Sequence, residues 1–383
     1  MIGLMRRGRA VGLCFAAVGM LGCEGGPAAD EPWFTDLPPI TWSGGHIEFG
    51  TDSEIMLCPE TVPSLDEYMA SAAARVRSGV TYPIEYYYLS EDLTDYGFLC
   101  PEGSVGCAAR DDERPVVGSK LPSLRHELIH AAVSSSPYHH RVLDEGLAVY
   151  LGTDLQRMGQ AVPSEIRAAF ASVDGTGGLL PAELYPVAGH FVSFLVEAHG
   201  LDATVSFVKA TETEMTLDDL AEVSLEHLGG DVRVDIDEYE TSGLGCEAAR
   251  FSPMWYECEH TPPSIPVFEC DASGEPVPVE VLVACGDGAT GVQDGKIWKD
   301  VLIELPEPAF PVVYLYEGHP VELVVRSCGS GCETPFARLS SESDEPGPLS
   351  PGVELGAGLH LIRIIKPVEA EGRVAFSLGM ECF

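Results

Sequence analysis

Apolar residues recur along this chain at two different spacings, and the spacing changes near residue 262. Before that point most apolar stretches repeat every three to four residues, as in helices that bury one face. We expect helices over 64–76, 122–133, 143–151, 164–173, 186–199, 202–210 and 217–227. Shorter β-type runs lie at 47–49, 84–89 and 115–117, and we expect the last to be an edge strand. Strands followed by helices predict an α+β domain over residues 41–262.

The pattern changes after Thr261-Pro262-Pro263. Short alternating or apolar runs follow, separated by glycine, proline, aspartate and serine, at 277–283, 301–305, 312–316, 321–325, 360–365 and 373–378. Such runs are typical of an antiparallel β-sandwich. We therefore expect a β-sandwich domain over 263–383, and the sequence assigns no chemistry to it.

Charge narrows the set of partners. The chain has 22 lysines and arginines against 60 aspartates and glutamates, which gives a formal net charge of −38 at pH 7. Because such a surface repels nucleic acid and anionic lipid headgroups, we expect neither as a partner. The acidic run over 231–240 is interpreted as a solvated loop, with calcium binding as the alternative.

The first residues have the layout of an export signal. Three arginines precede an apolar run over 10–21, which is too short for a stable membrane-spanning helix. Met20-Leu21-Gly22-Cys23 resembles the lipobox of bacterial lipoproteins, which implies a signal peptide over 1–22 and a lipid on Cys23. Residues 23–40 are expected to form a tether. Glu24 resembles the outer-membrane pattern of such proteins, so we expect an outer-membrane lipoprotein that contacts the membrane only through its lipid. Ordinary secretion is the alternative.

Cysteine usage agrees with export. Ten of the 12 cysteines lie beyond the signal region, and an even number in an exported protein predicts disulfides. Cys100 with Cys107, and Cys328 with Cys332, are close enough in sequence to close short loops. Five of the ten lie on each side of the change in pattern, so complete pairing requires at least one bridge between the two parts.

The most specific chemical signal is the segment Arg125-His126-Glu127-Leu128-Ile129-His130, which contains the pattern HExxH. Two histidines four residues apart on a helix lie on the same face, so both imidazoles can reach one metal ion. Catalytic zinc sites use three protein ligands and leave the fourth position to water. Glu127 is placed to accept the proton of that water as it attacks a carbonyl. The alternative is a buried helix that carries two ordinary histidines.

A third ligand is expected from the following helix. The longer pattern HExxHxxGxxH is absent, because Val133 and Ser136 stand at its glycine and histidine positions. Glu145 lies 15 residues after His130, beyond a Ser-Ser-Ser-Pro break. An antiparallel helix pair would bring Glu145 back over the two histidines. Asp144 is the rival ligand, since neighbouring positions on a helix differ by about 100° in direction.

Six residues together resemble the gluzincin type of zinc metallopeptidase, whose two-helix core carries HExxH and then E-G-x-A: His126, Glu127, His130, Glu145, Gly146 and Ala148. The resemblance covers roughly residues 47–225. It implies a zincin-like fold of a small β-sheet plus helices, with one zinc ion held by the two histidines and Glu145 and with Glu127 as the base. Two features depart from the pattern. The two motifs are closer together than in the best-known members, and Val149 stands where some members carry an aspartate that supports a ligand.

A peptidase also needs a hydrogen-bond donor for the oxyanion that forms on the attacked carbonyl. Related metallopeptidases often place a tyrosine or histidine from a later helix beside the zinc. Tyr185 and His190, at and within the helix expected over 186–199, are the candidates. Each also has an ordinary interpretation, as a packing residue at the helix entry and as a polar residue beside the apolar stripe.

These observations predict a zinc-dependent peptidase that acts on peptide or protein substrates. One alternative is a surface lipoprotein that keeps the fold as a binding or structural module. Another is zinc-dependent hydrolysis of a non-peptide amide. The sequence carries no signal for the oligomeric state or for a cleavage preference.

Overall fold

The structure is a computed structural model of the 383-residue chain. It describes residues 34, 36–54, 57–80, 82–98, 100, 104–111, 114–133, 139–152, 161–176, 178–241, 256, 258, 277–293, 295–305, 312–317, 320–328, 337–341, 347–349 and 356–379. The predicted signal peptide, Cys23 and most of the predicted tether lie outside these residues. None of the helices in the described ranges is long and apolar enough to cross a membrane.

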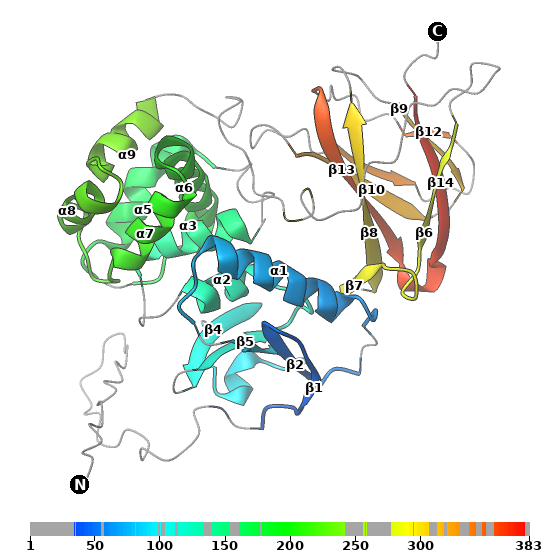
Figure 1. Cartoon of the computed structure of the whole chain (residues 1–383), viewed down its shortest axis with the longest axis horizontal. Helices are drawn as coiled ribbons and strands as arrows, with labels where there is room; N and C mark the ends of the chain where they lie inside the picture. Colours follow the sequence, from blue (N-terminus) through cyan, green and yellow to red (C-terminus); the bar gives the residue numbers. More distant parts are fainter. Residues whose placement is uncertain are drawn as a thin grey trace.

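The N-terminal part is built on a five-stranded mixed sheet of order β1-β2-β3-β5-β4 (Figure 1). Its strands are β1 (Ile40–Ser43), β2 (Ile47–Thr51), β3 (Ile84–Tyr88), β4 (Gly106–Asp111) and β5 (Arg114–Ser119). The inner pairs β2–β3 and β3–β5 are parallel, whereas the outer strands β1 and β4 pair antiparallel. The expectation of an edge strand at 115–117 was wrong, because β4 pairs outside β5. The small residues of β4 lack the β-branched and aromatic pattern by which strands are recognised in sequence.

Both faces of this sheet are covered. All five residues of β3 are buried, and successive side chains point to opposite faces. Tyr86 and Tyr88 join the main core beneath the helices, whereas Tyr87 joins a smaller cluster on the other face with Leu93 and Phe98. Burial on both sides explains why this strand lacks a strict alternation of apolar and polar residues.

Eight α-helices belong to the described part of this region. They are α1 (Thr61–Arg75), α2 (Arg125–Val133), α3 (Arg141–Leu151), α5 (Ile166–Val173), α6 (Tyr185–His199), α7 (Leu201–Ala210), α8 (Leu217–His227) and α9 (Val232–Thr241). Short 3-10 turns lie at Leu93–Tyr96, Pro163–Glu165 and Ala182–Leu184. In Figure 1, α1 and α2 lie over the sheet and the later helices gather to one side. The seven predicted helices are therefore present.

Helix α9 corrects one prediction, because the acidic run over 231–240 is not a loop. Val232, Ile236 and Tyr239 are fully buried, and their spacing of four and then three residues forms one helical stripe. Of the acidic residues between these positions, Asp237 and Glu238 are exposed, whereas Asp235 is buried. The abundance of carboxylates concealed an apolar pattern that was present in the sequence.

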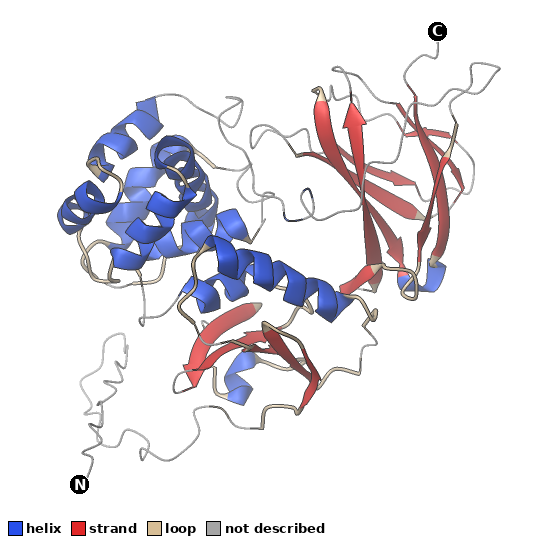
Figure 2. Cartoon of the chain, viewed as in Figure 1, coloured by secondary structure: helices blue, strands red, loops and turns tan. Residues whose placement is uncertain are grey.

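The C-terminal part contains two antiparallel sheets (Figure 2). One has five strands in the order β11-β10-β13-β8-β7, and the other has four in the order β12-β9-β14-β6. The strands are β6 (Val279–Val283), β7 (Thr290–Gln293), β8 (Lys296–Leu305), β9 (Val312–Glu317), β10 (Val321–Ser327), β11 (Ala337–Ser341), β12 (Gly347–Leu349), β13 (Gly358–Pro367) and β14 (Gly372–Gly379). A 3-10 turn at Val368–Ala370 joins the last two. Both sheets contribute to one hydrophobic core. The chain is thus a mixed α+β protein with several sheets.

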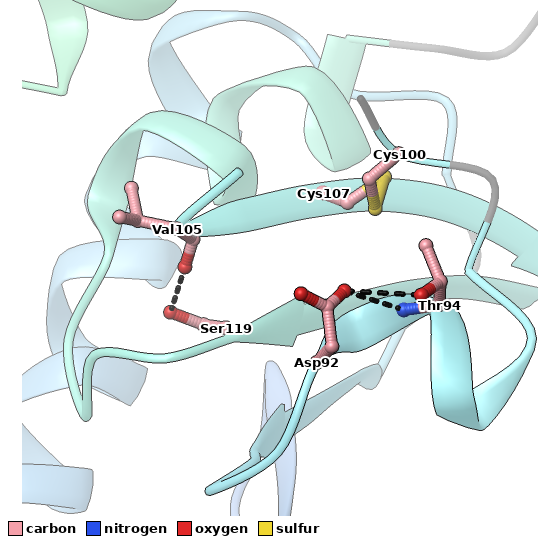
Figure 3. The surroundings of a disulfide bond; sticks show 6 residues. All are labelled: Asp92, Thr94, Cys100, Val105, Cys107 and Ser119. Carbon is pink, nitrogen blue, oxygen red and sulfur yellow. Dashed lines mark hydrogen bonds between the residues drawn. A yellow bond between two sulfur atoms is a disulfide. The ribbon is translucent and has the colours of Figure 1, made fainter. Parts of the chain in front are cut away.

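Three disulfides join described cysteines. Cys100–Cys107 closes a short loop before and within β4, as predicted, and Figure 3 shows it beside the loop around Asp92. Cys58–Cys285 connects the N-terminal part to the C-terminal sheets. Cys258–Cys328 connects the segment that follows the N-terminal part to the same sheets. The predicted Cys328–Cys332 pair was wrong, because Cys328 bonds to a residue 70 positions earlier in the sequence. Disulfides that join distant parts of a chain are typical of proteins in oxidising, extracytoplasmic compartments.

Candidate metal centre

Helices α2 and α3 carry the residues of the candidate site and lie antiparallel. A Cβ on Gly152, just after α3, would lie 3.1 Å from the backbone N and Cα of His126, near the start of α2. The beginning of α3 lies beside the second half of α2, where His130 contacts Asp144 and Glu145. The antiparallel pair brings the two sequence motifs together.

Three side chains converge on one point between these helices. The Nε2 atom of His126 lies 3.1 Å from Nε2 of His130 and 3.1 Å from Oε2 of Glu145. Nε2 of His130 lies 3.3 Å from the same carboxylate oxygen. Two atoms bound to zinc at about 2.0–2.1 Å in a tetrahedral arrangement are about 3.3 Å apart. Within the described residues, this trio is the group of histidine, cysteine and acidic side chains that could hold a metal ion.

Asp144, the rival ligand, contacts the His130 ring on the side that faces away from the trio. Oδ2 of Asp144 is 3.2 Å from Nδ1 of His130, the ring nitrogen that faces away from the trio. Asp144 is only 4% exposed. A carboxylate in this position fixes the ring orientation and tautomer of a ligand histidine and makes it a stronger base. By contrast, Nδ1 of His126 is buried without a hydrogen-bond partner in the described part of the chain.

The charges of the site favour a cation. Burial lowers the pKa of His130, but the carboxylates of Asp144 and Glu145 outweigh burial and raise that pKa well above its usual value. Burial raises the pKa of Glu145, but His130 and His126 hold it well below its usual value. The pKa of Asp144 is likewise lowered, because His130 outweighs the effect of burial. A protonated His130 therefore balances two buried carboxylates, and a divalent ion would displace that proton.

Glu127 belongs to α2, and its side chain lies against the strand β4. A Cβ built on Gly106, the first residue of β4, would lie 2.7 Å from Cγ of Glu127 and 2.1 Å from Cδ2 of Leu124. Any side chain larger than hydrogen at position 106 would therefore displace Glu127 or the helix start. No sequence signal indicated that Gly106 makes room for the predicted base.

Tyr185 lies at the trio. Its ring stacks on His126, with the centroids 5.8 Å apart and the planes 11° from parallel. Burial raises the pKa of Tyr185, and so do the charge of Glu145 and a hydrogen bond to it. The hydroxyl therefore remains protonated and donates to the carboxylate of Glu145.

The structure does not bring His190 to this site. Gly146 of α3 packs against Ala188 and Val192 of α6, and position 190 lies about 200° around the helix from each of them. Nδ1 of His190 is instead 2.5 Å from the hydroxyl of Tyr239 on α9. The sequence prediction of a catalytic role for His190 gains no support from this placement.

A tyrosine from the sheet fixes the start of α2. The hydroxyl of Tyr86 donates to the carbonyl of Leu121 at 2.6 Å and accepts from the backbone N–H of Leu124 at 2.8 Å. The helix begins at Arg125, three residues later than Pro122 suggested. This anchor was missed because the relevant contact joins β3 to a loop 35 residues further along the chain.

A search of protein-family models finds no match to this sequence, and no curated protein matches it significantly. The residues and geometry of the site are therefore the basis for inferring a function.

Proposed function

We propose that the chain is an exported zinc metallopeptidase of the gluzincin type. In this proposal residues 41–262 form a zincin-like domain and residues 263–383 form a β-sandwich. The observation that carries the proposal is the meeting of two imidazole Nε2 atoms and one carboxylate oxygen at 3.1–3.3 Å, on two antiparallel helices. Glu127, which directly follows His126, would supply the base.

The donor set favours zinc over the hard cations. Calcium and magnesium prefer oxygen ligands, whereas two imidazoles and one carboxylate are a frequent set in catalytic zinc sites. The trio provides no thiolate, which is more frequent in structural zinc sites. His126, His130 and Glu145 would hold the ion, and Asp144 would orient the His130 ring.

A zinc ion held there would supply Lewis acidity, polarising a carbonyl and lowering the pKa of water. Glu127 would accept the proton of the attacking water and pass it to the leaving amine. The hydrogen bond from Tyr185 to Glu145 keeps this hydroxyl close to the ligand set. Tyr185, kept neutral by its raised pKa, would move its single hydrogen bond from Glu145 to the oxyanion.

The sheet edge beside the site is suited to an extended peptide. Among the described strands β4 pairs only with β5, so its other edge carries backbone N–H and C=O groups that can pair with a peptide. Gly106 of this edge strand contacts Glu127. A peptide paired along β4 would therefore pass close to the base.

The test combines metal analysis with one isosteric variant. We expect about one zinc per chain, with loss of the metal in His126→Ala or His130→Ala. Glu127→Gln should retain zinc and the fold, but lower peptide hydrolysis by about 10²–10⁴-fold, because an amide cannot accept the proton. Glu222→Gln, an exposed position on α8, is the matched control and should leave hydrolysis unchanged.

The same experiment separates the alternatives. A zinc-loaded wild type that cleaves no member of a broad peptide library would decide for a non-catalytic binding module. Cleavage of small non-peptide amides alone would decide for the amidohydrolase alternative. Wild-type protein that binds no metal would remove the basis of both hydrolase functions and leave the binding or structural module.

We further propose that the protein is exported and anchored by a lipid on Cys23. The disulfides support an oxidising compartment, and the lipobox-like sequence supports the anchor. The mature protein should partition into detergent, and Cys23→Ser should move it to the aqueous phase. A mature N-terminus elsewhere, without lipid, would instead indicate ordinary secretion.

A further inference from the structure

The first residue of the metal-binding helix is enclosed by two aromatic rings. The guanidinium carbon of Arg125 lies 4.5 Å from the ring centroid of Tyr68 and 5.5 Å from that of Tyr256. The two rings meet edge to face with centroids 5.7 Å apart. They are 3% and 8% exposed, so the contacts are shielded from water. A cation over the face of a tyrosine is attracted by the ring quadrupole, and more strongly when water is excluded.

This cluster joins α1, the start of α2 and the end of α3. Tyr68 belongs to α1, and its hydroxyl donates to the carbonyl of Leu151 at the end of α3 at 2.9 Å. The hydroxyl of Tyr256 is 3.4 Å from Glu67, also on α1. Gly152, next to Leu151, packs on the backbone of His126. The start of α2 is therefore held against α1 and the end of α3 at one place.

Both tyrosines are tied to the C-terminal sheets by disulfides. Tyr256 lies two residues before Cys258, which is bonded to Cys328 just after β10. Tyr68 lies on the helix that follows Cys58, which is bonded to Cys285 just after β6. Cys58 itself is 1% exposed and belongs to the hydrophobic core of those sheets.

We propose that Arg125, Tyr68 and Tyr256 form a positioning cluster through which the C-terminal sheets hold the first metal ligand. Arg125 directly precedes His126, so holding Arg125 in place also holds the backbone of His126 in place. Precise ligand placement requires support from the surrounding residues. The proposal gives the C-terminal sheets a function without chemistry of their own, and it rests on the proposed metal centre but not on peptidase activity.

The experiment measures zinc affinity by chelator competition and records the visible absorption spectrum of the cobalt-loaded protein, both on the full mature chain. Arg125→Met and Tyr256→Leu should each weaken zinc binding by about 2- to 30-fold, the range expected from loss of a cation–ring contact. They should also alter the cobalt spectrum, which reports ligand geometry. Arg125→Lys and Tyr256→Phe keep the charge and the ring, and should remain close to wild type.

The chain offers a matched control in the C-terminal sheets. Arg363 lies 5.4 Å from the Trp298 ring and pairs with Asp300, so Arg363→Met removes the same kind of cation–ring contact, together with an ion pair, in sheets that carry none of the metal ligands. It should leave zinc affinity and the cobalt spectrum unchanged. The double variant Cys258→Ser/Cys328→Ser, which removes the anchor of Tyr256, should reproduce the loss seen in Tyr256→Leu.

Comparing a double variant with the two single variants distinguishes loss of the Arg125–Tyr256 contact from a general loss of fold. If the contact itself matters, the double variant Arg125→Met/Tyr256→Leu should be little worse than either single variant. Additive losses, or single variants that bind zinc like wild type, would overturn the positioning role while leaving the metal centre intact. Wild-type protein that binds neither zinc nor cobalt would overturn the metal centre and the positioning cluster together. Metal binding by wild type therefore distinguishes failure of the metal centre from failure of the positioning cluster alone.

Discussion

Two adjacent carboxylates illustrate how position on a helix assigns a chemical role. Asp144 and Glu145 are both buried at the start of α3. Glu145 reaches both Nε2 atoms of the histidines, whereas Asp144 reaches only the Nδ1 atom of His130. Because neighbouring helix positions differ by about 100° in direction, one side chain enters the trio and the other passes behind a ring.

This difference predicts unequal effects of removing each carboxylate. Glu145→Ala removes a direct ligand and should abolish stoichiometric zinc binding. Asp144→Ala leaves three donors in place and should weaken zinc binding by about 10–100-fold, the usual cost of losing an outer partner of a ligand. Chelator competition measures both affinities. If Asp144→Ala proves the more damaging change, Asp144 is the ligand and the roles must be exchanged.

At the scale of elements, the site depends on the close approach of α3 to α6. A Cβ on Gly146 would lie 2.5 Å from the carbonyl oxygen of Ala188 and 2.7 Å from Cγ2 of Val192. Glycine at this position therefore allows the backbones to approach, which places Glu145 beside the Tyr185 end of α6. In this chain, the glycine of the E-G-x-A segment is therefore required for the close packing of α3 on α6.

We expect Gly146→Ala to destabilise the protein by about 1–3 kcal/mol, because overpacking against a backbone atom outweighs the roughly 1 kcal/mol gained in helix propensity. Denaturant unfolding of the metal-free protein measures the change. Gly79→Ala is the control, since position 79 is exposed and nothing lies within 4 Å of an added Cβ. Equal stabilities of the two variants would show that α6 moves aside without cost.

At the scale of the whole molecule, stability in mild acid depends on buried histidines outside the metal trio. Burial lowers the pKa of His360, and it lowers the pKa of two others most strongly. His140 is 1% exposed and packs on Phe170, and His190 is fully buried beside Tyr239. Burial lowers the pKa of each to about 4. The unfolded chain has an ordinary histidine pKa near 6.5. Each group therefore contributes stability above pH 6.5 that is lost as pH falls through 4.

The expected loss between pH 6.5 and 4 is about 3 kcal/mol for each of the two histidines, as an order of magnitude. His130 contributes little slope in this window, because the stability that comes from its raised pKa is present below pH 6.5 and is lost only as pH rises above that value. Unfolding free energies of chelator-treated protein across this range measure the slope. His190→Leu should reduce the slope by up to about half, because His140 and His360 keep their own contributions, even though losing the partner of Tyr239 lowers stability at every pH. An unchanged slope would show that His190 has the same pKa in the folded and the unfolded protein.

The helices and the two histidines of the trio that could hold a metal ion were predictable from local sequence, because each depends on periodicity or on short spacing. Histidines four residues apart on a helix share a face whatever surrounds them, and the seven predicted helices follow their apolar stripes. The prediction of α9 was wrong because the many carboxylates concealed the stripe formed by Val232, Ile236 and Tyr239. Cys100–Cys107 was predictable because a short loop limits the choice of partner.

Only the tertiary structure decided the contacts between residues far apart in the sequence. It pairs Cys328 with Cys258, directs His190 toward α9, and places the Tyr86 hydroxyl at the start of α2. It also separates Asp144 from Glu145, which spacing alone left open. Sequence periodicity fixes which face of an element is buried, but not which element covers that face. The partners of these side chains are set by how helices and strands pack, because that packing depends on the whole core.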